Sequence, residues 1–418
     1  MFEQAARPQP PTRDRLRMAL NQPLRGEPAL RRESVTELMD LSSLGGRWFD
    51  SPHGPGYVID SLYEAGHMHG EVALHRALGI APARLAGQIK DPRLADTAAA
   101  SFVYVDTETT GLGGAGTMVF LCGVARFEGA TLRLRQFLLP GPQYEGGLLG
   151  GLSKELDGAQ ALVSYNGKSF DVPALEARYI LSRQRPALRA LPHLDLLHPN
   201  RRLFKGLIES HRLPMVEREL LGFEREDDCP SAEVPERYFR FQRSGDPTHI
   251  RPVLRHNAWD ILSLVALAAH LAAVCDDGAN HPLQAARAAE YAGDHGAAAL
   301  HYEATLNGTP GRPERLEAME RAARCHARIG QWEAAAAHWQ SLIDEPRSRR
   351  VLPYIELAKL AEHRLRDLAR AYILTDEALT LATRGLIRTG AVSGELSLES
   401  LERRRARLRG KLERAVSR

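Results

Sequence analysis

The distribution of apolar and polar residues divides the chain near residue 276. Upstream of that point, short apolar runs rich in β-branched and aromatic residues occur at 102–105, 117–127 and 132–139. Such runs, bounded by turn residues, are typical of strands, whereas apolar residues spaced by three and four are typical of helices. Downstream, the segments are Ala-rich and have the helical pattern without strands. We therefore expect an α/β domain followed by an all-α region.

The three β-type runs are joined by short loops, which predicts an antiparallel meander. A helix over 148–156, a strand over 161–165 and a helix beginning at Asp171 are expected next, followed by a short strand over 191–197. The apolar run 250–274 predicts one long helix. Together these elements predict a mixed sheet flanked by helices.

The all-α region contains an approximate internal repeat. Segments 293–302 and 330–339 place small and aromatic residues alike, 37 positions apart, and a more degenerate pair spans 352–382. This pattern resembles tetratricopeptide repeats, stacked helix pairs that commonly bind a partner segment but also serve as packing modules. The last segment, 398–416, predicts a basic amphipathic helix that either caps the repeats or contacts nucleic-acid phosphates.

Composition adds little to this picture. The chain has 418 residues, 44% hydrophobic and 26% charged, with a formal net charge of +3, which is ordinary for a globular protein of two or three domains. Its four cysteines are far apart, so we expect reduced, mostly buried thiols and a cytoplasmic location. The apolar run 261–274 is too short to cross a bilayer, so no membrane association is expected.

Candidate chemistry begins where the first predicted strand ends. Asp106 and Glu108 are two positions apart, so both side chains should point to one face, about 7 Å apart along the backbone. Two such carboxylates can share a hard cation, although this spacing also arises by chance in a chain with 52 acidic residues. The following glycines, 111–116, satisfy G-x-G-x-x-G, but a β-type run follows them where a dinucleotide site requires a helix. We therefore exclude a dinucleotide site.

Three further residues have the right chemistry for such a site. Asp171 stands at a predicted strand-to-helix junction, where its alternative role is to cap the helix. His256 and Asp260 are four residues apart and share one face of the predicted long helix, where they can also form a simple ion pair. The histidines at 67, 69 and 75 lack an acid or cysteine at convincing ligand spacing, so we do not expect a metal site there.

In order and spacing, these motifs resemble those of the DEDD exonuclease superfamily: Asp106 with Glu108, then Asn166 to Asp171, then His256 to Asp260. The resemblance implies a ribonuclease H-like fold. It also implies a 3′-to-5′ exonuclease that hydrolyses single-stranded DNA or RNA to nucleoside 5′-monophosphates.

The same resemblance implies two divalent cations, Mg²⁺ or Mn²⁺. Asp106 would contact both ions, Glu108 and Asp260 would hold the one that activates water, and Asp171 would hold the other. His256 departs from the family pattern, because it combines the residue of the histidine subclass with the spacing of the tyrosine subclass. We expect His256 to be the general base.

A closer resemblance is to bacterial proteins of the YprB type, which place such a domain before tetratricopeptide repeats. Its motifs are GFEREDD at 222–228, EVPERYFRF at 233–241 and RHNAWDILSL at 255–264.

We expect substrate contacts from Thr109, Gly111, Asn166 and Lys168. The aromatic residues Tyr104, Phe170 and Trp259 are expected in the core.

The expected organisation has four parts: a Pro/Arg-rich arm over 1–45, a ribonuclease H-like domain with an N-terminal extension over 46–278, tetratricopeptide-like repeats over 279–390, and the basic helix over 391–418. The competing hypothesis is a catalytically silent nuclease-like domain in a protein-binding scaffold. Degenerate nuclease domains typically lose acids, so the presence of all four favours the enzyme.

Overall fold

The computed structural model describes residues 40–64, 66–111, 116–185, 188–345, 350–388 and 396–416. Residues 41–418 form one unit, to which all the contacts below belong. The predicted arm over 1–45 lies almost entirely outside the described residues.

Among the described residues, seven strands form one sheet in the order β1-β2-β7-β6-β5-β8-β9. The strands are β1 (Arg47–Ser51), β2 (Gly54–Tyr63), β5 (Phe102–Thr109), β6 (Val119–Glu128), β7 (Thr131–Leu138), β8 (Ala161–Ser164) and β9 (His193–Asp195). Neighbours from β1 to β5 are antiparallel, whereas β8 pairs in parallel with both β5 and β9. The predicted meander and mixed sheet are confirmed.

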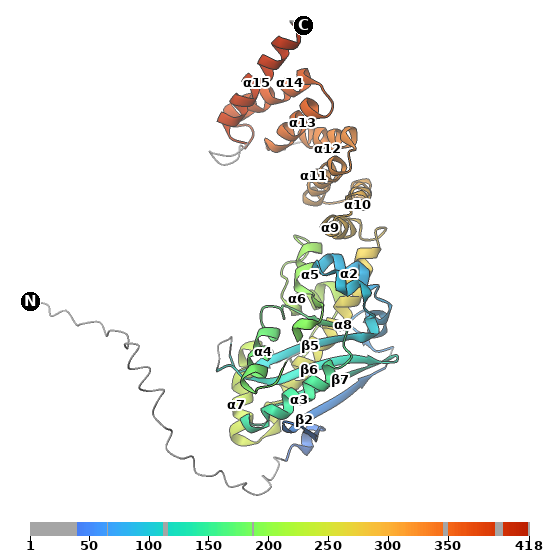
Figure 1. The fold of residues 1–418 in the computed structure, drawn as a ribbon, viewed down its shortest axis with the longest axis vertical. Helices are drawn as coiled ribbons and strands as arrows, with labels where there is room; N and C mark the ends of the chain where they lie inside the picture. The colour runs from blue at the N-terminus through green and yellow to red at the C-terminus, as the bar shows by residue number, and fades with distance from the viewer. Residues whose placement is uncertain are drawn as a thin grey trace, which may run out of the picture. The chain divides into compact units, whose positions relative to one another are not determined.

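Helices cover both faces of this sheet. They are α2 (Pro82–Ile89), α3 (Glu145–Leu156), α4 (Asp171–Leu181), α5 (Leu197–Leu203), α6 (Leu213–Val216), α7 (Val234–Ser244) and α8 (Arg251–Asp276). Adjacent residues of β7 reach opposite layers: Gln136 donates to the backbone of α8, while Phe137 packs against Gly151 of α3. In Figure 1, α3 accordingly lies in front of the strands and α8 behind them.

One predicted strand is shorter than expected. The strand over 191–197 ends at Asp195, because the Asp195 carboxylate accepts a hydrogen bond from the backbone N–H of Leu197, where α5 begins. A separate two-stranded sheet pairs β3 (Met68–His69) with β4 (Val72–Ala73), and a 3₁₀ segment follows it.

Helix α8 is the central helix of the domain. The helical stretch Pro247–Asp276 extends well beyond the apolar run 261–274 and is long and apolar enough to span a membrane by length and composition. However, 72% of its apolar window is buried inside the protein. Burial of this extent is expected of a core helix. Neighbouring elements of the protein, and not lipid, cover its apolar surface.

The region after α8 consists of paired helices, as predicted (Figure 1). They are α9 (Pro282–Ala292), α10 (His295–Asn307), α11 (Arg312–Arg328), α12 (Trp332–Asp344), α13 (Leu352–His363), α14 (Leu368–Thr383) and α15 (Leu398–Val416). The residues that define the sequence repeat have equivalent roles: Tyr302 and Trp339 are both buried, and Gly293 and Gly330 both adopt positive φ at a helix end.

The predicted basic helix is α15, and it packs against α14. Leu401 and Leu408 are buried on its inner face. Arg407 and Lys411 both donate to the buried carboxylate of Glu362 on α13. These contacts favour the capping interpretation over a nucleic-acid contact.

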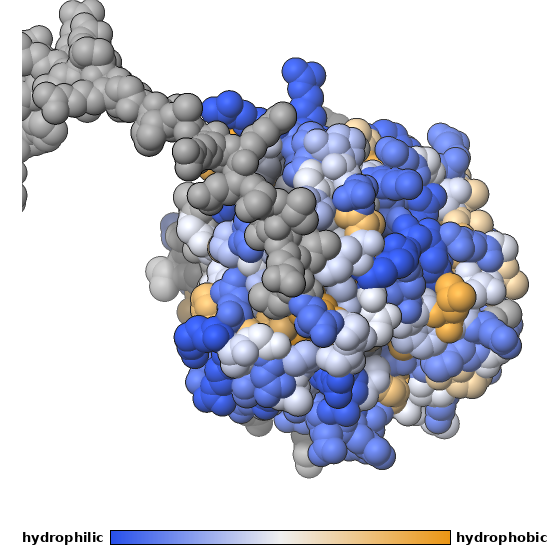
Figure 2. Space-filling view, turned by 90° about the horizontal axis from the view of Figure 1, so that it is seen from below, coloured by the Kyte–Doolittle hydropathy of each residue, from blue (hydrophilic) through white to orange (hydrophobic). Residues whose placement is uncertain are grey.

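The four cysteines also follow the expectation. Cys122, Cys229 and Cys325 are buried, Cys275 is half-buried, and all four are free thiols. In the described part of the face drawn in Figure 2, the surface is mostly hydrophilic and its hydrophobic residues are scattered.

Candidate active site

The end of β5 positions Asp106 and Glu108. Residues 102–105 are almost completely buried and fix the strand between β6 and β8. The register with β6 shifts between Glu108 and Thr109, so regular pairing is interrupted immediately after the two acids. Both carboxylates therefore project from the end of a rigid, central strand.

Helix α8 brings His256 and Asp260 to the same place. Between them, Asn257 donates from Nδ2 to Asp106 Oδ2 at 2.8 Å, which ties the helix to β5. This close approach depends on Gly123 of β6, because a Cβ atom there would clash with Asn257 Oδ1. The sheet and α8 are thus held in contact at the level of the acids.

Asp171 is held by β5. Its Oδ1 accepts two hydrogen bonds from Thr107, at 2.9 Å from the backbone N–H and 2.6 Å from the hydroxyl. The N-cap position of α4 is Phe170, and no side chain caps the helix there. The Asp171 side chain therefore does not cap α4 but points towards the strand that carries the other two acids.

The loop before Asp171 is shaped by Asp195. The buried Asp195 carboxylate accepts hydrogen bonds from the backbone N–H groups of Asn166 (2.7 Å) and Lys168 (3.1 Å). Asn166 adopts a left-handed backbone conformation with φ of 64°. The side chain of Asn166 is half-buried, whereas that of Lys168 is exposed and lines a hollow with Asp91 and His193. Their contact with substrate stays a prediction.

Thr109 and Gly111 lie directly beyond the acids of β5. The Thr109 hydroxyl donates to the Gly111 carbonyl at 2.8 Å, which turns the chain at the end of the strand. Residues 112–115 lie outside the described part of the chain. The role of this loop in substrate binding also stays a prediction.

The convergence of these acids is visible in their electrostatics. Burial, and then the negative charges of Asp260 and Asp171, raise the pKa of Asp106 and of Glu108 well above the ordinary carboxyl range. The guanidinium of Arg225 opposes this effect at Glu108. Like charges that approach in a partly desolvated site disfavour the ionised form of each group.

Asp171 follows the same rule. Burial raises its pKa to about 6 although its hydrogen bonds from Thr107 act in the opposite direction. Without a counter-charge, the carboxylates therefore oppose one another's ionisation. A set of carboxylate oxygens with one imidazole is the donor set that suits hard divalent cations such as Mg²⁺ and Mn²⁺. Ligand atoms of Glu108, His256 and Asp260 already lie within 4.8 Å of one another.

Arg225 provides positive charge behind the acids. Its guanidinium pairs with Glu217 at 2.6 Å, with Asp228 at 3.0 Å, and with Asp260 Oδ1. The side chain of Arg225 is 5% exposed and that of Glu217 is fully buried. Because Oδ1 of Asp260 is bound to Arg225, the other oxygen, Oδ2, faces His256 Nε2 at 3.5 Å. Arg225 thus orients Asp260 as well as compensating its charge.

Asp228 orients His256. Its Oδ1 lies 2.7 Å from His256 Nδ1, and its Oδ2 accepts from Arg225 at 3.0 Å. Burial raises the pKa of Asp228, but the hydrogen bond from His256 and the charge of Arg225 lower it by more. The pKa of Asp228 therefore lies below its ordinary value. The Arg225 guanidinium, which can only donate, lies 3.2 Å from the same Nδ1, but the contact with Asp228 is the shorter one. An ionised carboxylate can only accept, so the Asp228 contact favours the neutral tautomer with its proton on Nδ1. The free Nε2 then faces Glu108 Oε1 at 3.9 Å and Asp260 at 3.5 Å.

The structure therefore brings together all five residues proposed to carry the chemistry. Sequence reasoning missed four of their partners, Glu217, Arg225, Asp228 and Asn257. A signal was present, because GFEREDD contains Arg225 and Asp228, and RHNAWDILSL contains Asn257.

One aromatic residue is misplaced by the prediction. Tyr104 is fully buried and Trp259 is half-buried, but Phe170 is 54% exposed and therefore not a core residue. It is the residue just before Asp171, and its side chain is open to solvent.

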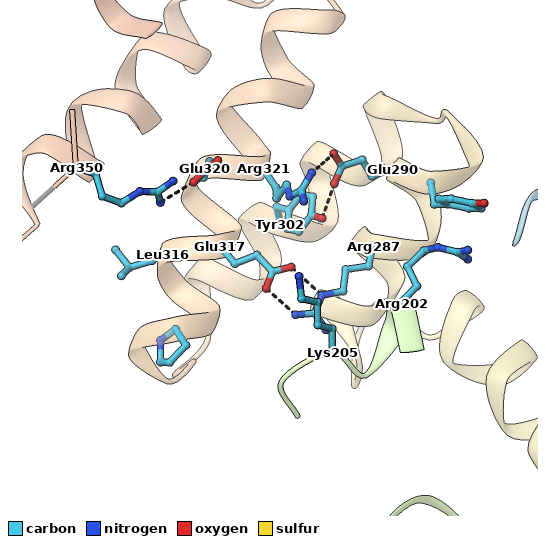
Figure 3. A pocket seen from close by; sticks show the side chains of 12 residues that line it. Arg202, Lys205, Arg287, Glu290, Tyr302, Leu316, Glu317, Glu320, Arg321 and Arg350 are labelled. Atoms are coloured by element: carbon cyan, nitrogen blue, oxygen red, sulfur yellow. Dashed lines mark hydrogen bonds and ion pairs between the residues drawn. The ribbon is translucent and has the colours of Figure 1, made fainter. Parts of the chain in front are cut away.

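A cavity of about 640 Å³ lies elsewhere, and its lining includes residues of α5, α9 and α11 (Figure 3). Most of its charges are paired across the cavity wall. Arg287 pairs with Glu317 at 2.6 Å, and Arg321 pairs with Glu290 at 3.1 Å. None of the predicted site residues lines it, so it is not part of the carboxylate site.

Comparison with known proteins agrees with this geometry. Residues 103–272 match a family model described as the RNase H superfamily, and this range includes all five residues of the site. The uncharacterized protein YprB of Bacillus subtilis is 33% identical over 316 residues, which cover 74% of this chain and 74% of that protein. The chain therefore belongs to the same family as YprB, and its residues 103–272 form a domain of the RNase H superfamily.

Proposed function

We propose that the protein is a metal-dependent nuclease, and specifically a 3′-to-5′ exonuclease that releases nucleoside 5′-monophosphates from single-stranded nucleic acid in the cytoplasm. The observation that carries the proposal is the convergence of Asp106, Glu108, Asp171 and Asp260 from one strand and two helices. Their mutual charge helps to raise the pKa of Asp106 and Glu108, which is the electrostatic environment that divalent cations relieve.

The donor set fits two divalent cations, Mg²⁺ or Mn²⁺, held by the four acids in the roles that the family resemblance implies. When bound, such ions supply positive charge at the attacked phosphate and at the leaving oxygen. The protein contributes rigidity. Asp106 is held by Asn257, Asp171 by Thr107 and Asp260 by Arg225, so the oxygens are fixed before substrate arrives.

His256 is suited to accept the proton of the attacking water. Its Nε2 has a free lone pair and faces Glu108 and Asp260, whereas its Nδ1–H is bound to Asp228. Asp228 keeps the ring in this tautomer and stabilises the imidazolium that forms when Nε2 is protonated. A positioned base of this kind contributes about a hundredfold to ten-thousandfold in rate.

The direct test uses the purified full chain with single-stranded DNA and RNA labelled at the 5′ end. The proposal expects successive shortening from the 3′ end with Mg²⁺ or Mn²⁺ and no reaction with EDTA. A circular single strand should be resistant, because it has no end.

Two results would contradict parts of the proposal. Cleavage of the circle would replace the exonuclease with an endonuclease. A lack of cleavage of every substrate, with either metal present, would support the catalytically silent scaffold instead.

A further inference from the structure

The helical region contains a second group of convergent metal-ligating side chains. Glu303 lies on α10, His326 on α11 and His338 on α12, three consecutive helices of which α11 packs against both of the others. One ligand atom from each lies within 4.8 Å of the other two. No residue of this group belongs to the carboxylate site.

The geometry of the group is close to that of a coordination sphere. His326 Nε2 lies 2.7 Å from Glu303 Oε1, and His338 Nε2 lies 3.7 Å from the same oxygen. The two imidazole rings are nearly parallel, with 14° between their planes and 5.4 Å between their centroids. Around a tetrahedral zinc ion with bonds of about 2.1 Å, ligand atoms are roughly 3.4 Å apart. The two observed separations bracket that value, so small side-chain rotations are sufficient.

An outer partner fixes the first histidine. His326 Nδ1 lies 2.6 Å from Gln331 Oε1, at the start of the next helix. With Nδ1 donating to this oxygen, Nε2 is the ring nitrogen directed at Glu303. Without an ion, Nε2 carries the proton that the 2.7 Å contact with the carboxylate requires, and a bound ion would take the place of that proton. Histidines that ligate metals commonly donate their second ring N–H in this way, which sets the ligating nitrogen and the orientation of the ring.

Burial gives the group a closed and an open side. The side chain of His326 is 6% exposed and that of His338 is 18% exposed, whereas that of Glu303 is 38% exposed. The imidazoles therefore lie inside the helical stack, and the carboxylate lies where it opens to solvent. An ion can enter from that side, and water can complete its coordination.

We propose that Glu303, His326 and His338 bind one divalent transition-metal ion of the zinc type, with a fourth position open to solvent. Two imidazole nitrogens and one carboxylate oxygen are a donor set for zinc, whereas Mg²⁺ prefers oxygen ligands and retains waters. Because the ligands come from three successive helices, the ion would join α10, α11 and α12 and stabilise the helical region.

The test compares zinc binding by the chelator-stripped full chain and its variants, using calorimetry with zinc chloride in the presence of excess Mg²⁺. The wild type should bind one zinc ion that His338→Ala does not bind, or binds at least about a hundredfold more weakly. His363→Ala is the matched control, since His363 lies on α13, outside the group. Asp106→Asn should retain this zinc ion, because it alters only the carboxylate site.

A second measurement does not depend on how the His338 variant folds. Co²⁺ in place of zinc should give the visible absorption of a four-coordinate nitrogen and oxygen site, and Glu303→Gln should shift or weaken that spectrum. Zinc should also raise the unfolding temperature of the wild type but not of His338→Ala. Equal zinc stoichiometry in wild type and His338→Ala, with an unchanged Co²⁺ spectrum in Glu303→Gln, would overturn the proposal.

Discussion

The carboxylate site and the Glu303 group are both formed by side chains from three different elements, but their chemistry differs. In the first, four carboxylates converge beside the central strand. Burial raises the pKa of Asp106, Glu108 and Asp171, and repulsion by the other site acids adds to this effect at Asp106 and Glu108. In the second, two imidazoles and one carboxylate meet in a stack of helices. The first group therefore accumulates negative charge, while the second can be neutral or carry a single charge.

This difference teaches how each group is stabilised without an ion. The carboxylate site needs a built-in cation, and Arg225 provides it through its pairs with Glu217, Asp228 and Asp260. The Glu303 group needs no separate cation, because an imidazole can itself hold the proton that pairs with the single carboxylate. Substitutions that remove one of the acids, or the arginine that compensates them, should consequently have large effects on the nuclease rate or the stability of the carboxylate site.

The largest effect is expected from Asp106→Asn and Asp171→Asn. Each removes an oxygen ligand and should lower the nuclease rate at least about a thousandfold, equivalent to roughly 4 kcal/mol of transition-state stabilisation. Stability without metal should be unchanged or higher, because one of the repelling charges is gone. Rates and urea unfolding of both variants test this.

Asp60→Asn is the matched control, since Asp60 pairs with Arg47 and Arg135 on the sheet and should leave the rate unaltered. If Asp106→Asn and Asp171→Asn cut at the wild-type rate, the site assignment would be wrong.

Arg225→Met should have an effect of comparable size in free energy, but on stability and not on transition-state stabilisation. It leaves the buried carboxylate of Glu217 and that of Asp260 without their cation, which costs about 3–5 kcal/mol in the free energy of unfolding. Arg237→Met removes only an exposed i,i+4 pair with Glu233, so its effect should be below about 1 kcal/mol. Similar unfolding midpoints in the two variants would show that Arg225 does not compensate the site.

The pH dependence of stability should reveal the raised pKa of Asp171. Its pKa is raised from 3.8 to about 6 on folding, so the folded state favours the protonated acid. The metal-free protein should therefore gain stability as the pH falls from 8 towards 4, and lose it as the pH rises through 6. A shift of this size corresponds to roughly 3 kcal/mol. Unfolding midpoints across this range should depend less on pH in Asp171→Asn; identical profiles would disprove the shift.

A smaller loss of nuclease rate is expected from His256→Ala than from the acid-to-amide variants. Removing a positioned general base should lower the rate about a hundredfold or more without changing the fold. His256→Tyr, which recreates the tyrosine subclass at its own spacing, should restore part of the rate. His198→Ala, on the exposed side of α5, is the control. A near-normal rate in His256→Ala would leave water activation to the metal ions alone.

The sequence predicted the elements and the acids for a physical reason. The alternation of residues in strands and the spacing of three and four in helices are local patterns, so β5 and α8 could be recognised. The same patterns indicated the faces on which Asp106, Glu108, His256 and Asp260 lie. Asp171 was found through its junction and the family motif. The weakest elements, such as the strand ending at Asp195, were misjudged because a single side-chain hydrogen bond determines where they end.

The partners of the site were not predictable in the same way. Arg225 meets Asp260 across 35 positions and Asn257 meets Asp106 across 151, and no periodicity encodes such contacts. The same applies to Glu303, His326 and His338, which have no ligand spacing in the sequence. The histidines at 67, 69 and 75 are close in sequence, yet no metal site was expected there. One of them, His69, has its Nε2 2.7 Å from the Ser263 hydroxyl.

The most direct test of the account is Mn²⁺ binding to the metal-free full chain, measured by calorimetry and by the unfolding temperature. The four converging carboxylates predict that Mn²⁺ binds to the wild type and to Asp60→Asn and raises the unfolding temperature of both. Asp106→Asn should bind Mn²⁺ much more weakly and gain little stability from it. Equal binding and equal stabilisation in Asp106→Asn and the wild type would contradict the claim that these carboxylates form a metal centre.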